Sequence, residues 1–381
     1  MGNFPFGDSA ANAARVSKFY RPETWIEGRS EDQLNHVASW DGISKIAAFP
    51  DLHPGRYGPV GAAFLSDRIY PQLIGPDIGC GMALFKLDMH RRKLKLDKAS
   101  RRLRVLEHGA PKDRAAEALR DIGLDGVASP IGLGHVGHGN HFCELQAVEE
   151  IFSEDCAKKL DLSKGQLCLL VHTGSRNYGA RIFSNLEAKW ASGYLDGSTE
   201  ASDYLQLHDR AFAWARINRQ LIAEVAADAL RVDFELLCDA SHNHLEAVED
   251  GWLHRKGAAC PDRGYAPLAG SRESLSYLLS CSDIPDEALG SLSHGAGRRY
   301  DRGSMHGRIR KTRSGLAAMS KNPFGGQVIC EDPALMIEEA GMAYKNAADV
   351  AADLEAFNVA RRAASFAPLI TFKTARIGGD T

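Results

Sequence analysis

The stretch LCLLVHTGSRNYG, Leu167 to Gly179, joins a short apolar run to a loop rich in glycine and polar side chains. An apolar run of this length that ends in such a loop is typical of a buried β-strand. The same pattern recurs in SKIAAFPDLHPG, which begins at Ser44, and in FELLCDASHNH, which begins at Phe234. The sequence therefore predicts a protein built on strands whose ends carry polar loops.

Helical periodicity appears in two other regions. Between Asp203 and Leu230 the apolar residues fall three or four positions apart, which predicts an amphipathic helix. A second helical region is predicted in ALMIEEAGMAYKNAADVAADLEAF, and PLITFKTAR after it predicts a final short strand that carries Lys373. Strands and helices alternate without a regular βαβ count, so the predicted fold class is α+β.

The composition is that of an ordinary globular protein, with 44% hydrophobic and 25% charged residues in a chain of 381. No repeat or Pro/Ser-rich linker marks a boundary, so we expect one continuous catalytic domain over residues 1–381. No apolar run approaches the roughly 20 residues that cross a bilayer, and we expect no membrane partner. The eight cysteines form no CxxC pair, which favours a cytoplasmic location.

One cysteine lies in an unusual setting. The segment IGPDIGCGMALF places Cys80 between two glycines and Asp77 three residues earlier, while His141, His172 and His242 stand in similar strand-end loops. Carboxylate, thiolate and imidazole together suit zinc, iron, cobalt or manganese. Alternatively, the cysteine is a small buried hydrophobe, the aspartate a turn former and each histidine a core residue. Their coincidence in glycine-rich loops favours the metal site, although no two of them form a compact ligand motif.

Charge restricts the choice of partners. The formal net charge of -3 excludes a protein that is basic overall, so a nucleic-acid partner requires a local patch. The segment RRYDRGSMHGRIRKTR, Arg298 to Arg313, holds seven basic residues and the single acid Asp301. Such a run fits a phosphate backbone, but by itself it is equally typical of a solvated surface.

Nine motifs in order along the chain, from Phe49 to Lys373, resemble those of the RtcB family of RNA ligases. They are PDLHPG, PDIGCGM, GNHFCE, HTGSRNYG, SHNH, HRKGA, SHGAGRR, FGGQVICED and FKT. The resemblance implies a single large RtcB-like domain with mixed β-sheets, irregularly interleaved helices and a central cleft for metal and nucleotide.

The resemblance also implies a role for individual residues. His294 would attack the α-phosphate of GTP and become a covalent histidine-GMP. Two manganese ions would be held by Asp77, Cys80, His141, His172 and His242, with the sulfur of Cys80 between them. Contacts to the nucleotide would fall on Asn140, Glu144, Asn243, Ser271, Gly295, Ala296, Gly297 and Lys373. Contacts to RNA phosphate would fall on Arg176, Arg298 and Arg302.

The implied reaction joins an RNA 3′-phosphate or 2′,3′-cyclic phosphate end to a 5′-hydroxyl end. One loop differs from the usual family sequence, because Ser271 is followed by Arg272 and Glu273 where the family has glycine and methionine. This difference, with SHNH and the PLITFKT ending, resembles the branch encoded beside release factor H. That branch implies functional coupling to release factor H and repair of ribosomal RNA in damaged ribosomes.

Two other classes of function remain open. A metal-dependent cyclic phosphodiesterase would keep the metal ligands without needing His294 as nucleophile, and a non-ligating RNA-binding factor would need only the basic run. Individual residues also have plainer interpretations, with Asn140 as a turn residue, Glu144 as a surface acid and Lys373 as a solvated charge. Three further histidines have no matched role and are interpreted as structural: His135, His138 and His244.

Overall fold

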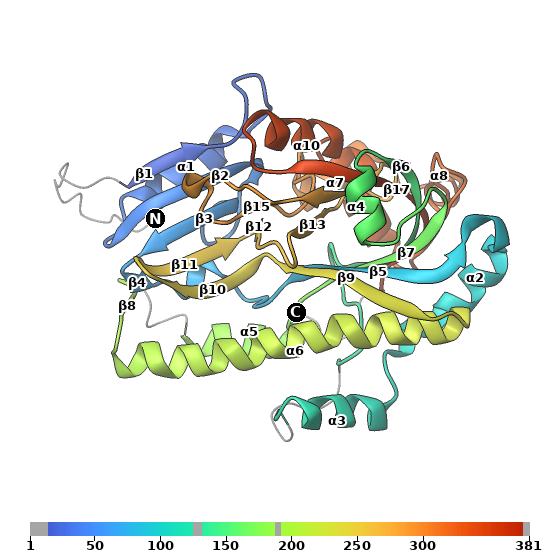
Figure 1. Cartoon of the computed structure of the whole chain (residues 1–381), viewed down its shortest axis with the longest axis horizontal. Helices are drawn as coiled ribbons and strands as arrows, with labels where there is room; N and C mark the ends of the chain where they lie inside the picture. Colours follow the sequence, from blue (N-terminus) through green and yellow to red (C-terminus); the bar gives the residue numbers. More distant parts are fainter. Residues whose placement is uncertain (1–13, 125–131, 187–191, 376–381) are drawn as a thin grey trace.

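The computed structural model describes residues 14–124, 132–186 and 192–375, and two β-sheets dominate it (Figure 1). The smaller sheet has the order β1 (Arg15–Lys18), β2 (Ile43–His53), β3 (Val60–Ser66), β11 (Gly251–Lys256) and β10 (Asn243–Val248). The larger sheet has the order β13 (Tyr265–Leu268), β14 (Ser276–Ser280), β17 (Arg361–Phe372), β6 (Phe142–Ile151), β7 (Gln166–Thr173), β5 (Gly81–His90) and β9 (Phe234–Ser241), with β16 (Gln327–Ile329) paired to β17. Two short pairs are β12 (Ala258–Ala259) with β15 (Leu292–Ser293) and β4 (Arg68–Ile69) with β8 (Tyr194–Leu195).

The larger sheet is buried on both faces, and successive residues of a strand alternate between them. On β5, Ala83 and Phe85 pack in one core together with Ile222 of helix α6 (Thr199–Leu230). Met82 and Leu84 pack in the core on the opposite face. A strand covered on both sides needs apolar residues at every position, which explains the unbroken apolar runs of the sequence. The predicted strands and the α+β class are confirmed.

Helix α6 runs along one side of the larger sheet (Figure 1). The hydroxyl of Ser198 caps its first turn by accepting a hydrogen bond from the backbone N–H of Ala201 at 3.2 Å. The helix ends at Arg231, which adopts a left-handed conformation with φ 63°. The helix predicted over 203–230 is confirmed, and it starts four residues earlier because the capping serine lies upstream.

The second helical region consists of α9 (Pro333–Glu338) and α10 (Ala347–Ala356), which a short 3₁₀ turn at Gly341–Ala343 separates. The interruption lies where the N–H of Gly341 donates to Glu273 Oε1 at 3.0 Å. Strand β17 follows and is longer than expected, and Lys373 lies one residue beyond its end. The other α-helices are α1 (Gly28–Ala38), α2 (Leu96–Leu103), α3 (Lys112–Asp121), α4 (Glu154–Lys159), α5 (Asn177–Leu186), α7 (Arg302–Arg308) and α8 (Arg313–Met319).

The topology of the larger sheet brings the ends of four strands to one edge. Strand β5 is antiparallel to both β7 and β9, and β6 is antiparallel to β7. The starts of β5 and β6 therefore lie beside the ends of β7 and β9. Because strands from Gly81 to Phe372 share this sheet, we propose that the chain forms one catalytic domain. Within the described residues, no helix is long and apolar enough to span a bilayer.

Candidate metal and nucleotide site

All five predicted metal ligands lie at this common edge. Asp77 and Cys80 precede β5, and His141 precedes β6. His172 is the penultimate residue of β7, and His242 follows β9. The strand register pairs Gly81 with both Thr173 and Ser241, which fixes these neighbours side by side. The structure brings these five residues together, and their role as ligands stays a prediction.

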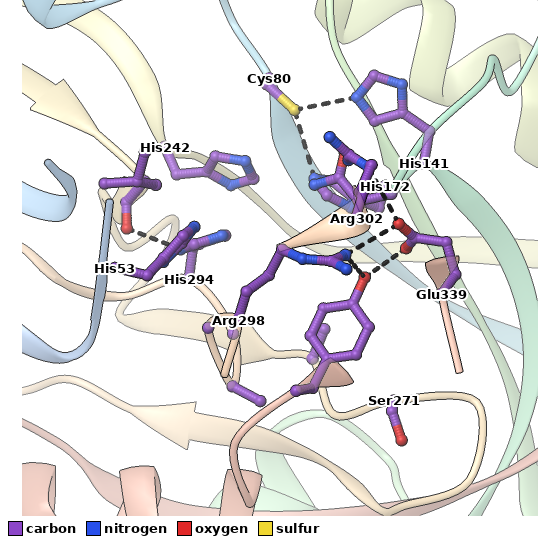
Figure 2. Close-up of a pocket in the computed structure, with 18 of the residues that line it drawn as sticks. His53, Cys80, His141, His172, His242, Ser271, His294, Arg298, Arg302 and Glu339 are labelled. Carbon is purple, nitrogen blue, oxygen red and sulfur yellow. Dashed lines mark hydrogen bonds and ion pairs between the residues drawn. The ribbon is translucent and has the colours of Figure 1, made fainter. Parts of the chain in front are cut away.

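Figure 2 marks the contacts of Cys80 with two of the histidines. The Sγ of Cys80 is 3.5 Å from His141 Nε2 and 3.3 Å from His172 Nε2. His141 Nε2 is also 2.9 Å from Asp77 Oδ2. Two sets of donor atoms, each within 4.8 Å of one another, share the cysteine: Asp77, Cys80 and His141 form one, and Cys80, His172 and His242 form the other. One sulfur common to two donor sets is the arrangement that a bridged pair of metal ions requires.

The chemistry of these donors fits divalent transition metals. Burial lowers the pKa of His172 and His242 well below the ordinary value, so both imidazoles are neutral and free to donate a lone pair. The Nδ1 atoms of both rings are buried and have no hydrogen-bond partner among the residues that the structure describes. Burial raises the pKa of Asp77, but the charge and hydrogen bond of His141 outweigh it and keep the carboxylate ionised. A buried polar cluster with unpartnered nitrogens is costly unless something binds it.

A buried arginine of α6 holds the strand ends that carry these donors. The side chain of Arg219 is fully buried and donates from Nη1 to the backbone oxygens of Gly79 at 2.7 Å and Thr173 at 2.9 Å. Its Nε donates to Asp239 Oδ1 at 2.7 Å, and its Nη2 to the hydroxyl of Ser241 at 3.2 Å. One guanidinium thus links the ends of β5, β7 and β9, which fixes the spacing of the donors. The sequence analysis missed this residue, because an arginine within an amphipathic helix gives no sign of burial.

Close approach of other groups to two glycines also sets the geometry. A side chain at Gly174 would place a Cβ only 2.5 Å from Asp77 Oδ1. At Gly297, φ is 71° and a Cβ would lie 2.3 Å from the backbone oxygen of Asp51. Both positions therefore require glycine, the first for space and the second for space and conformation.

The predicted nucleophile lies next to the donor group. The His294 ring follows β15 and its centroid is 4.5 Å from that of His242. His294 Nδ1 is 2.7 Å from the backbone oxygen of Gly257 and 2.7 Å from Asp51 Oδ2. Both partners are acceptors, so Nδ1 carries the proton and Nε2 keeps its lone pair for attack. Asp51, in the PDLHPG motif of β2, had no role in the sequence analysis, although its place in a motif was a signal.

An Asp51→Asn substitution should slow the covalent modification of His294 by about 10²- to 10⁴-fold without changing metal content. The amide can present an N–H toward Nδ1, which would move the ring proton to Nε2 and remove the nucleophilic lone pair. The check is a single-turnover rate of protein labelling from α-labelled GTP, with bound metal measured on the same samples. An unchanged labelling rate would mean that Gly257 alone fixes the ring.

The donors and His294 open into a pocket of about 830 Å³. Every predicted nucleotide-binding residue lies on its wall: Asn140, Glu144, Asn243, Ser271, Gly295, Ala296, Gly297 and Lys373. Glu144 and Lys373 are each only 3% exposed, so the interpretations of a surface acid and a solvated charge are wrong. Burial raises the pKa of Glu144 to about 7, and Lys373 Nζ donates to the backbone oxygen of His141 at 3.0 Å.

A buried glutamate links two of the three arginines predicted to bind RNA phosphate. Glu339 Oε1 accepts hydrogen bonds from Arg298 Nη1 at 3.0 Å and Arg302 Nε at 3.4 Å, while Oε2 accepts one from Tyr344 (Figure 2). Burial opposes ionisation, yet the charges of Lys373 and the two arginines lower the pKa of Glu339 to about 2. Arg298 also donates to two backbone oxygens and is largely buried, whereas Arg302 is 47% exposed. Arg302 is therefore the better placed of the two to reach a ligand.

The loop after Ser271, which differs from the usual family sequence, is held in place by the two differing residues, Arg272 and Glu273. Arg272 is buried, and its Nη2 donates to the backbone oxygen of Met336 at 2.8 Å. Glu273 accepts the N–H of Gly341, and its own N–H donates to the hydroxyl of Ser271 at 3.2 Å. These contacts fix the loop against the segment between α9 and α10, so Ser271 stays at the pocket wall.

Arg176 is not among the residues that line the pocket. Its Nη1 lies 2.7 Å from His141 Nδ1, and its backbone N–H donates to Asp77 Oδ1 at 2.8 Å. It thus contacts two predicted ligands from behind, an arrangement suited to positioning them, and its contact with RNA phosphate stays a prediction. His244 likewise faces away from the donors, because its Nε2 contacts Arg255 Nη1 at 2.9 Å.

Comparison with known proteins places this site in a family. A family model described as tRNA-splicing ligase RtcB matches residues 33–129 and 128–374. An RNA-splicing ligase RtcB2 of Escherichia coli is 37% identical over 361 residues, which cover 92% of this chain and 93% of the relative. A tRNA-splicing ligase RtcB of Thermococcus kodakarensis is 27% identical, with 91% of each chain covered. The protein belongs to the RtcB family of RNA ligases.

Proposed function

We propose that this protein is a GTP- and manganese-dependent ligase that joins RNA 3′-phosphate or 2′,3′-cyclic phosphate ends to 5′-hydroxyl ends. The observation that carries the proposal is the position of His294, whose ring lies 4.5 Å from His242 at the border of two donor sets that share Cys80. A nucleophile with a free Nε2 beside a site for two metal ions is suited to phosphoryl transfer.

The first step forms the bond between His294 Nε2 and the α-phosphorus of GTP, and the bond to pyrophosphate breaks. The imidazole gains positive charge as it reacts, and the buried carboxylate of Asp51 stabilises that charge through Nδ1–H. Bound manganese would supply charge neutralisation at the phosphate oxygens, held by Asp77, Cys80, His141, His172 and His242. Lys373 and Arg302 add positive charge to the wall of the pocket.

The later steps use the same pocket. Water first opens a 2′,3′-cyclic phosphate to a 3′-phosphate. An oxygen of that 3′-phosphate then attacks the guanylate phosphorus, which releases His294 and leaves GMP on the RNA end. The 5′-hydroxyl of the second strand attacks the RNA 3′-phosphorus, the strands are joined and GMP departs. Arg302, half exposed at the pocket wall, is placed to hold the RNA phosphate during both transfers.

In this proposal, Glu144 on the pocket wall selects guanine. Gln146 Nε2 donates to Glu144 Oε1 at 2.7 Å, and Thr371 donates to Oε2. These two bonds hold the carboxylate in one orientation, which suits it to accept the N–H groups of a guanine edge. Coupling to release factor H and repair of ribosomal RNA in damaged ribosomes are part of the proposal, and they rest on the sequence of the Ser271 loop and the SHNH and PLITFKT motifs.

The direct test is a joining reaction with purified protein. We expect an end-labelled RNA with a 2′,3′-cyclic phosphate to become longer when a 5′-hydroxyl RNA, GTP and manganese are all present. Omission of GTP should leave the cyclic phosphate opened but the strands unjoined. Opening without joining under every condition, with metal bound, would instead support the cyclic phosphodiesterase.

A further inference from the structure

A second pocket, of about 710 Å³, adjoins the site on the side of the loop between β1 and α1. Ser271, Arg299 and Tyr344 line both pockets. The second pocket also contains Trp25, which is 42% exposed, and Lys345. A tryptophan exposed in a hollow beside a phosphoryl-transfer site offers a large flat face to a ligand.

The loop that carries Trp25 is fixed in place. The buried carboxylate of Asp353, on α10, accepts hydrogen bonds from Arg21 Nε and from the hydroxyl of Thr24. The N–H of Thr24 also donates to the backbone oxygen of Arg21 at 3.0 Å, which closes a turn. The ring is thus presented by a preorganised turn, so binding would cost little ordering of the loop.

Cations stand beside the ring. The guanidinium carbon of Arg299 is 5.9 Å, and the Nζ of Lys345 is 5.5 Å, from the Trp25 ring centroid. Within the described part of the chain, Arg299 has no acidic side chain within ion-pair distance. It also lies 5.5 Å from the Tyr300 ring centroid, over which Arg308 stands at 3.8 Å. Aromatic rings and guanidinium groups thus alternate from the pocket toward the basic segment.

The charged side chains that line the second pocket balance one another. Three are acidic, Glu23, Glu273 and Asp349, and three are basic, Arg21, Arg299 and Lys345. The carboxylates can accept the N–H groups on the edge of a neutral base, and the cations can meet the phosphate attached to it. The unpaired cation Arg299 stands at the border of the two pockets, where the phosphate attached to such a base would lie.

We propose that Trp25 stacks an unpaired nucleobase of the RNA substrate, and that Arg299 binds the phosphate next to it. The inference rests on the proposed function, because it places an RNA strand beside the pocket of His294. Stacking on an aromatic ring is tolerant of sequence, since every base has a π face. The second pocket is therefore a subsite for single-stranded RNA near the end to be joined.

The test measures binding of two short fluorescent oligoribonucleotides, one ending in a 3′-phosphate and one beginning with a 5′-hydroxyl. We expect Trp25→Ala to weaken binding of one of them by about 5- to 100-fold, the loss typical of one base stack. Which oligonucleotide is affected identifies the strand. Trp25→Phe should restore most of the affinity, whereas Trp25→Leu, which is apolar but has no π face, should not.

A matched control lies elsewhere on the surface. Phe152 is also 42% exposed and has Arg362 5.3 Å from its ring centroid, but it lines neither pocket. Phe152→Ala should bind both oligonucleotides like the wild type. An Arg299→Gln variant should reduce the slope of log affinity against log salt concentration by the amount expected for about one lost phosphate contact. Trp25→Ala should leave that slope unchanged.

Guanylation separates failure of this inference from failure of the proposed function. Transfer of label from α-labelled GTP uses no RNA, so the Trp25 variants should react at the wild-type rate. Wild-type affinity for both oligonucleotides in Trp25→Leu would overturn the stacking subsite and leave the ligase intact. Loss of guanylation in Trp25→Ala would also overturn it, because the ring would then serve the nucleotide site or the fold. A wild-type protein that never accepts label would contradict the proposed function itself.

Discussion

A His294→Ala variant should form no covalent guanylate, with labelling from α-labelled GTP reduced by at least about 10³-fold, to background. The substitution removes the proposed nucleophile. In the wild type, Nδ1 is fixed by Gly257 and Asp51, which leaves Nε2 to attack. The wild-type product should be labile to acid and stable to base, as a phosphorus–nitrogen bond is.

The control for this experiment is His53, a histidine of the same pocket that lies outside the two donor sets. The His53 ring lies 6.5 Å from that of His294, and its Nδ1 contacts the backbone oxygen of Asp51 at 2.8 Å. Burial lowers the pKa of His53 to about 4, so its imidazole is neutral at physiological pH. A His53→Asn variant should still accept label. Label that persists in His294→Ala and disappears in His53→Asn would reverse the assignment.

Metal content decides what a negative labelling result means. His294 is not within the two donor sets, so His294→Ala should bind as much manganese as the wild type. If metal is lost together with labelling, the residue acts as a ligand or holds the ligands in place. The nucleophilic role would then need a different candidate.

Sequence patterns predicted the parts of the molecule where short stretches of sequence determine both the secondary structure and the position of the polar residues. Apolar runs became strands of the two large sheets, and in the larger sheet the polar residues at the strand ends converged because the strands are antiparallel neighbours. Lys373 was expected on a strand and lies one residue beyond the end of β17. It is still close to Glu144, because Thr371, two residues earlier, pairs with Glu144 on the neighbouring strand. Such convergence depends on the order and direction of the strands in the sheet. The motifs indicated this topology only through their resemblance to a known family.

The contacts that support the site could not be predicted from patterns. Arg219 and Glu339 are buried and ion-paired, yet both lie in helix-rich segments where charged residues normally face water. Trp25 lies in a loop that matches no motif, and its position depends on Asp353, more than 300 residues later in the chain. Pairing over such distances is a property of the tertiary structure and leaves no periodic trace in the sequence.

Replacement of the shared sulfur should have the second large effect. In Cys80→Ser we expect manganese affinity to fall by about 100-fold or more, because the substitution removes a donor common to both sets. Burial raises the pKa of the Cys80 thiol well above its ordinary value, so metal binding must displace a proton that the protein alone retains. Guanylation should fall with metal content, and excess manganese should restore only part of it.

Cys168→Ser is the matched control. Cys168 is a buried thiol of β7, four residues before His172, and it packs in the same core as Met82. It should keep wild-type metal content even if its thermal stability falls. Cobalt provides a readout that is independent of activity, because sulfur bound to cobalt gives charge-transfer absorption. That band should be present in wild type and Cys168→Ser and absent in Cys80→Ser. Unchanged metal affinity and an unchanged band in Cys80→Ser would contradict a sulfur-bridged pair, and the two donor sets would then have to bind metal independently of the cysteine between them.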